Sequence, residues 1–221
     1  MRPLTVVALL ALGSSAAAQA PVTPSAPPVP PAGRAFEVRL GGVMIAGERN
    51  SEYFDNFASG SGLVRGAEGL LRGKAGGLSF RTLSSDFGEQ PQVTSADLRL
   101  LIGPPVFTVA VGGSRRVLWS SLGSNSFDFG LAGVSTTLAI GGTGLRANAG
   151  GVMYFPRPTT EETMKGGMEG ETSLIYTLPR LPLYVQVGYR TELFTAVSGT
   201  KESPEELRGI RVGGGLQLGG R

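Results

Sequence analysis

The chain has 221 residues, of which 35 are glycine, 41% are hydrophobic and only 17% are charged. It contains no cysteine and no histidine, which excludes disulfides and thiolate metal sites and removes the commonest general base and transition-metal ligand. The net charge of +3 is too small to indicate a nucleic-acid partner. We therefore expect neither an enzyme nor a protein that holds a cofactor or a metal.

The first 20 residues have the pattern of a secretory signal peptide. Arg2 supplies a positive start, residues 4–12 form a short apolar run, and small residues follow up to Ala20. We expect cleavage after Ala18, with a second candidate site after Ala20. Residues 1–18 are thus predicted to direct export. Residues 19–35 are rich in proline and are predicted to form an extended tether that cannot join a sheet.

From Phe36 onward, apolar and polar residues alternate with a period of two, which is typical of β-strands with two different faces. The hairpin from Met168 to Val197 shows the pattern best. In its second arm Leu183, Val185 and Val187 share one face, and Gln186, Gly188, Arg190 and Glu192 share the opposite one. Ten candidate strands follow the pattern, at residues 36–47, 62–72, 75–83, 93–102, 106–116, 126–140, 145–155, 167–178, 183–197 and 207–219.

Short and long connections alternate between these segments. Tight turns are predicted at Gly73-Lys74, at Gly103-Pro104-Pro105, at residues 141–144 and at residues 179–182. The other connections are longer and polar. In the last of them, Ser203-Pro204-Glu205-Glu206 has the pattern of a helix capping box, which predicts one helical turn. An even number of strands with alternating short and long connections is the plan of a transmembrane β-barrel.

Over residues 36–221 this plan resembles that of the small outer-membrane β-barrel proteins of bacteria. The resemblance implies a single all-β, antiparallel barrel with short periplasmic turns and longer outer loops, which places the proline-rich tether in the periplasm. It also implies a monomer that contacts outer-membrane lipid and the barrel-assembly machinery. The last strand departs from the family pattern, because it ends Leu218-Gly219-Gly220-Arg221 and not on an aromatic residue. An eight-stranded barrel, with the hairpin at residues 62–83 misread, is the alternative.

Alternation alone leaves open which face is inside. A soluble barrel turns its apolar face inward and a membrane barrel turns it outward, so the direction of Leu183, Val185 and Val187 distinguishes them. We favour the membrane barrel because the polar face carries charges of both signs, which can pair in an enclosed lumen. The charges expected to line the lumen are Arg39, Glu68, Arg81, Asp97, Arg99, Asp128, Arg146, Glu169, Glu171, Arg190, Glu192 and Arg211.

The first long connection is the most distinctive candidate contact surface. Tyr53, Phe54 and Phe57 lie there among acidic residues, which suits either contact with an extracellular ligand or a position at the membrane interface. Because a barrel of this size is largely filled by its own side chains, we expect a structural or loop-mediated role with at most a narrow solute path. The competing hypothesis is a secreted or periplasmic soluble barrel that binds an apolar ligand inside.

Overall fold

The computed structural model describes residues 36–51, 58–88, 92–120, 123–157, 163–198 and 201–219. The expected signal peptide, the tether and the aromatic residues Tyr53, Phe54 and Phe57 lie outside these ranges. The described residues form ten antiparallel strands in one closed barrel. The strands are β1 (Phe36–Ser51), β2 (Ala58–Gly73), β3 (Gly76–Asp86), β4 (Gln92–Ile102), β5 (Thr108–Ser120), β6 (Gly123–Ile140), β7 (Leu145–Pro156), β8 (Thr163–Thr177), β9 (Leu183–Ser198) and β10 (Lys201–Gly219).

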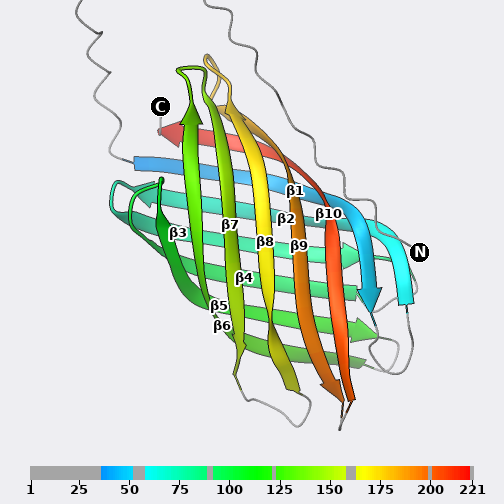
Figure 1. Cartoon of the computed structure of the whole chain (residues 1–221). Helices are drawn as coiled ribbons and strands as arrows, with labels where there is room; N and C mark the ends of the chain where they lie inside the picture. The colour runs from blue at the N-terminus through cyan, green and yellow to red at the C-terminus, as the bar shows by residue number, and fades with distance from the viewer. Residues whose placement is uncertain are drawn as a thin grey trace, which may run out of the picture. The chain divides into compact units, whose positions relative to one another are not determined.

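Each strand pairs with its neighbours in sequence, and β1 closes the ring by pairing with β10 from Glu37↔Gly219 to Ser51↔Glu205. Figure 1 shows β7, β8 and β9 crossing in front of the strands of the far wall. Closure leaves no unpaired strand edge, so the backbone groups of the wall are satisfied within the barrel. We call the end that carries β1's first residue and the tight turns the turn side, and the opposite end the outer end.

The predicted ten strands are confirmed. The eight-stranded alternative is wrong, because β2 and β3 pair continuously from Leu63↔Asp86 to Arg72↔Gly77. Several strands reach further at the outer end than predicted, and β10 begins as early as Lys201. The alternation of apolar and polar residues weakens in these outer segments, because the outward side chains there are polar as well.

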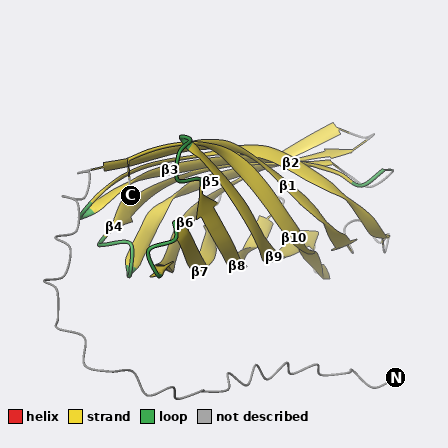
Figure 2. Ribbon diagram, turned by 90° about the horizontal axis from the view of Figure 1, so that it is seen from above, coloured by secondary structure: helices red, strands yellow, loops and turns green. Residues whose placement is uncertain are grey.

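Among the described residues Figure 2 shows strands and loops but no helix. No helix in these ranges is long and apolar enough to cross a membrane. The helical turn expected at Ser203–Glu206 is wrong, since this segment belongs to β10 and pairs with β9 out to Lys201↔Ser198. Pairing with the neighbouring strand supplies hydrogen bonds along the whole segment, whereas a single helical turn is costly to nucleate.

The connections on the turn side are tight, as predicted. Between β6 and β7, Gly141 and Gly144 have φ angles of 57° and 80°, in the left-handed region that favours glycine. Between β4 and β5, Gly103 has a φ angle of 99°, and its amide donates a hydrogen bond of 2.8 Å to the carbonyl of Ala75 in the β2–β3 turn. The turn chemistry seen in the sequence therefore forms this end of the barrel.

The outward face is apolar on every described strand. Leu183, Val185 and Val187 are 37%, 52% and 50% exposed, so they point away from the interior. Outward charged side chains on these strands, such as Glu48 and Arg208, occur only in the outer halves. The large apolar side chains exposed on the wall include Phe36, Leu40, Met44, Leu71, Leu78, Phe80, Leu98, Leu100, Ile102, Val109, Val111, Val134, Leu138, Ile140, Met153, Phe155, Met168, Leu174, Tyr176, Tyr189, Leu193, Ile210, Val212, Leu216 and Leu218.

Candidate functional site in the barrel interior

Eleven of the twelve charged residues expected in the lumen lie on the inner face of the barrel. Their side chains are between 1% exposed, for Arg190, and 19% exposed, for Glu68. They come from β1 to β4 and from β7 to β10, so charge is distributed round most of the wall. These eleven residues are Arg39, Glu68, Arg81, Asp97, Arg99, Arg146, Glu169, Glu171, Arg190, Glu192 and Arg211.

Asp128 lies on the outer face, so the prediction that it lines the lumen is wrong. Its carboxylate accepts a hydrogen bond of 2.8 Å from the Nε of Arg115, and both residues lie on the outside of the wall. The inner face of β6 at this height carries Phe127, Phe129 and Leu131, which are buried. Because the outer end of the wall meets water, the polar side chain of Asp128 can face outward there, while its apolar neighbours fill the lumen.

Ion pairs between opposite walls cross the middle of the lumen. Arg81 on β3 lies 2.7 Å from Asp97 on the adjacent β4 and 2.6 Å from Glu169 on β8. Since β3 and β8 are five strands apart in a ring of ten, the second pair spans the centre of the barrel. Glu169 also lies 3.2 Å from Arg190 and 3.4 Å from Arg99. One buried carboxylate is therefore held by three guanidinium groups from three strands.

Hydroxyl groups complete this central network. Tyr154 donates a hydrogen bond of 2.5 Å to Glu169, and Ser114 donates one of 2.6 Å to Asp97. Such bonds to ionised acceptors are stronger than neutral ones and offset part of the cost of burying charge. Along the barrel axis the network continues through the ion pairs Arg190–Glu192, Arg116–Glu192, Arg211–Glu68 and Arg211–Glu171.

Apolar clusters fill part of the lumen nearer the outer end. The rings of Phe129, Tyr154 and Phe194 pack with centroids 5.1 to 6.2 Å apart, and the Arg116 guanidinium lies 3.6 Å from the centre of the Phe194 ring. These clusters could not be predicted from the sequence, because an apolar residue that faces inward looks the same in sequence as one that faces lipid. The second cluster consists of Val43, Ile45, Val64, Leu83 and Phe87, with Leu207 packed against it.

Some inward charges at the strand ends were not predicted from the sequence. Arg49 and Glu205, in segments expected to be loops, form an ion pair of 2.8 Å inside the barrel. Arg116 is buried next to the exposed Arg115. The alternation of β5 could have predicted this. Val109 faces outward, and Arg115 lies an even number of residues further along the strand, so Arg115 faces outward and Arg116 inward.

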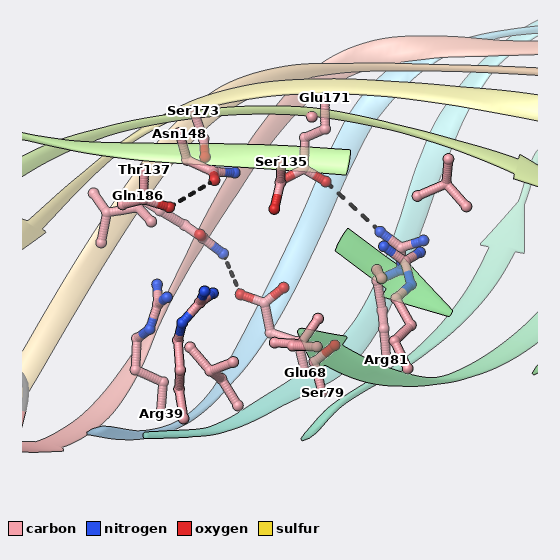
Figure 3. Close-up of a pocket in the computed structure, with 18 of the residues that line it drawn as sticks. Arg39, Glu68, Ser79, Arg81, Ser135, Thr137, Asn148, Glu171, Ser173 and Gln186 are labelled. Atoms are coloured by element: carbon pink, nitrogen blue, oxygen red, sulfur yellow. Dashed lines mark hydrogen bonds and ion pairs between the residues drawn. The ribbon is translucent and has the colours of Figure 1, made fainter. Parts of the chain in front are cut away.

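A cavity of about 190 Å³ occupies the turn-side half of the lumen. Figure 3 shows Arg39 and Glu68 pointing into it from one wall, with Asn148 and Ser173 on the other. The Gln186 side chain reaches across and donates a hydrogen bond to Glu68. The cavity is thus lined by charged and hydrogen-bonding groups. In the described part of the barrel, no group of three or more carboxylates is placed to hold a metal ion.

No protein-family model matches the chain, and no curated protein sequence matches it. Among solved structures, the chain is similar to the deltaS2 mutant of the TodX monoaromatic hydrocarbon channel, with a TM-score of 0.34 and 7% sequence identity. The alignment covers 83% of this chain and 90% of that one. A similarity this low shows nothing about the function of this chain.

The distribution of apolar and charged side chains decides the class of barrel. The apolar surface extends over all ten strands, far more than the isolated patches that a soluble monomer exposes, and the charges are enclosed. A wall of this kind is stable when hydrocarbon surrounds it. The protein is a transmembrane β-barrel. The soluble barrel with an apolar ligand site is ruled out by the outward direction of Leu183, Val185 and Val187, which would have had to fill its centre.

Proposed function

We propose that the protein is a bacterial outer-membrane barrel with a lumen closed by its own side chains, and that it acts through its outer loops or as a structural component of the envelope. The observation that carries this proposal is the Arg81–Glu169 pair, which joins opposite walls at 2.6 Å. A wide aqueous pore would require this pair and its neighbours to separate. The barrel therefore offers at most a narrow, polar path for small solutes.

An outer-membrane location is supported by the wall and by the N-terminus. On every described strand, the outward side chains carry no charge from the turn side to the middle of the strand. A continuous uncharged band of this kind is expected where the wall contacts lipid. The signal-peptide pattern in residues 1–18 supports export, and in the family that the chain resembles the turn side faces the periplasm. The proline-rich residues 19–35 would then tether the barrel's first strand on the periplasmic side.

Charged pairs on the outward face mark the strand ends from which the outer loops leave. Arg208 of β10 lies 3.1 Å from Glu48 of β1, and Arg115 of β5 pairs with Asp128 of β6. These outward pairs lie near the outer end and join adjacent strands. We infer that the loops beyond this polar rim would present Tyr53, Phe54 and Phe57 to an extracellular ligand. The closed ring has no unpaired strand edge to recruit a second copy, which supports a monomer.

Cell fractionation followed by gel electrophoresis of boiled and unboiled samples tests this location and fold. We expect recovery in the outer-membrane fraction and a change in mobility on boiling, since closed membrane barrels resist detergent until heated. Recovery in the soluble periplasm without a mobility change would contradict the proposal. A variant that lacks residues 52–57 should still show the mobility change, and any extracellular ligand that it fails to bind would then be assigned to that loop.

A further inference from the structure

The turn-side cavity has more positive than negative charge in its lining. Five arginines and three glutamates line it. Arg81, Arg99 and Arg211 are each bound to two or more carboxylates. The imbalance is therefore concentrated on the remaining two arginines, Arg39 and Arg72, and the glutamates that line the cavity are Glu68, Glu169 and Glu171.

Arg72 has no carboxylate partner among the described residues. Its Nη2 donates hydrogen bonds of 2.5 Å to the Thr108 hydroxyl and 3.1 Å to the Gly103 carbonyl, and these neutral groups orient the guanidinium without cancelling its charge. Its Nε is buried and donates to no described group. A guanidinium held in this way by neutral acceptors keeps donors and charge available to a bound anion.

Arg39 shares its carboxylate with another arginine. Its Nε lies 3.0 Å from Glu37, and the same carboxylate accepts a hydrogen bond of 3.0 Å from Nη1 of Arg146. Among the described residues, Glu37 is the carboxylate that forms ion pairs with Arg39 and Arg146, and Arg72 forms no ion pair. Positive charge without a matching carboxylate is costly to enclose, and a bound anion would offset that cost.

The opposite wall of the cavity supplies neutral donors. Ser135, Thr137, Asn148 and Ser173 line it from β6, β7 and β8 (Figure 3). The Thr137 hydroxyl lies 3.1 Å from Asn148 Oδ1, but the buried Ser173 hydroxyl has no hydrogen-bond partner among the described residues. A buried hydroxyl without a partner destabilises the fold unless a ligand or water satisfies it.

We infer that this cavity binds a small oxyanion, namely the carboxylate or phosphate group of a small polar solute. Arg39 and Arg72 would supply charge and paired N–H donors, and Ser173 would supply a hydroxyl donor from the facing wall. A cavity of about 190 Å³ has room for a solute of the size of phosphate or succinate. The inference concerns the interior alone, so it is independent of what the outer loops contact and of any conductance.

Isothermal titration of the full-length protein in detergent tests the inference, with inorganic phosphate and succinate as probes. We expect saturable binding of at least one probe. Arg72→Gln and Arg39→Gln should each weaken it by roughly tenfold or more, because a hydrogen bond to a charged group contributes about that much. The control is Arg115→Gln, which removes the same charge from the outer face and should leave binding unchanged. Absence of saturable binding to the wild-type protein, or equal loss in the control, would overturn the inference.

A second measurement avoids variants that fail to fold. Methylglyoxal, a dicarbonyl of about the size of the two probes, modifies guanidinium groups that small solutes can reach, and mass spectrometry of the wild-type protein locates the modified residues. Phosphate or succinate should slow modification of Arg39 and Arg72 and leave Arg115 unaffected. Equal modification rates with and without both probes would count against a site in the cavity, even if the Arg72 and Arg39 variants lose binding through misfolding.

Discussion

The guanidinium of Arg81 on β3 and the carboxylate of Glu169 on β8 meet at 2.6 Å across the middle of the barrel. The two residues are 88 positions apart in the sequence and come from diametrically opposite strands. Their pairing holds opposite walls together and occupies the space that an aqueous pore would need. Stability and permeability of this barrel are therefore expected to depend on the same side chains.

Removing the charge of Glu169 should strongly destabilise the barrel. Glu169→Gln leaves three buried guanidinium groups with too few carboxylates, and losing one member of a buried ion pair costs about 3–5 kcal/mol. Urea unfolding in detergent micelles measures the effect. The control Glu48→Gln removes the same charge from the exposed outer rim and should leave the free energy of unfolding nearly unchanged. Similar unfolding midpoints for the two variants would contradict a structural role for the network.

Removing both members of the central pair should open the lumen. The double variant Arg81→Ala/Glu169→Ala deletes the side chains that cross the centre. It removes one positive and one negative charge, so the net charge of the lumen is unchanged. We expect planar-bilayer conductance to rise above that of the wild-type protein. The matched control is Arg115→Ala/Asp128→Ala, which removes an ion pair of the same chemistry from the outer face. A wild-type conductance as large as that of the double variant would show that the network does not block the lumen.

The lipid-facing band makes a prediction that depends on depth. Val187 points outward near the middle of the apolar part of β9, whereas Thr195 is near the outer end of the same strand. Val187→Arg should destabilise the barrel folded in vesicles by about 2–4 kcal/mol, and Thr195→Arg should destabilise it by about 0–1 kcal/mol. Folding titrations in urea with lipid vesicles compare the two. A larger effect at Thr195 would contradict the position of the lipid-facing band, because it would place the outer end of β9 deeper in the membrane than Val187.

We expect close packing to require glycine at position 188, on the inner face of β9. A Cβ added at Gly188 would touch the backbone carbonyl of Thr172 and lie 2.7 Å from the Cβ of Ser173, neither of which can rotate away. Gly188→Ala should therefore cost about 1–3 kcal/mol, as overpacked interiors do. At Gly42, on the outer face, the nearest atom is a carbonyl oxygen 3.8 Å away. Gly42→Ala is the control, and thermal unfolding should separate the two variants.

The architecture could be predicted from the sequence because its signals are local. Alternation with a period of two identifies a strand from a few consecutive residues, and turn chemistry such as Gly141 to Gly144 acts within four residues. The ten strands, the tight turns and the even strand number follow from these signals. The signal peptide in residues 1–18 and the loop contact at Tyr53, Phe54 and Phe57 stay predictions, since they lie outside the described residues.

Which side chains meet in the lumen was decided only by the tertiary structure. The tilt and register of ten strands bring Arg81 level with Glu169, and no local pattern carries that information. Asp128 shows that a local pattern is also insufficient at the outer end, because polar residues face inward within the lipid band but face either side of the wall above it. The position of Arg72 without a carboxylate also depends on neighbours from other strands. Sequence alone determined that this chain forms a two-faced barrel wall, and closure of the wall determined which charges are paired and where a cavity is left.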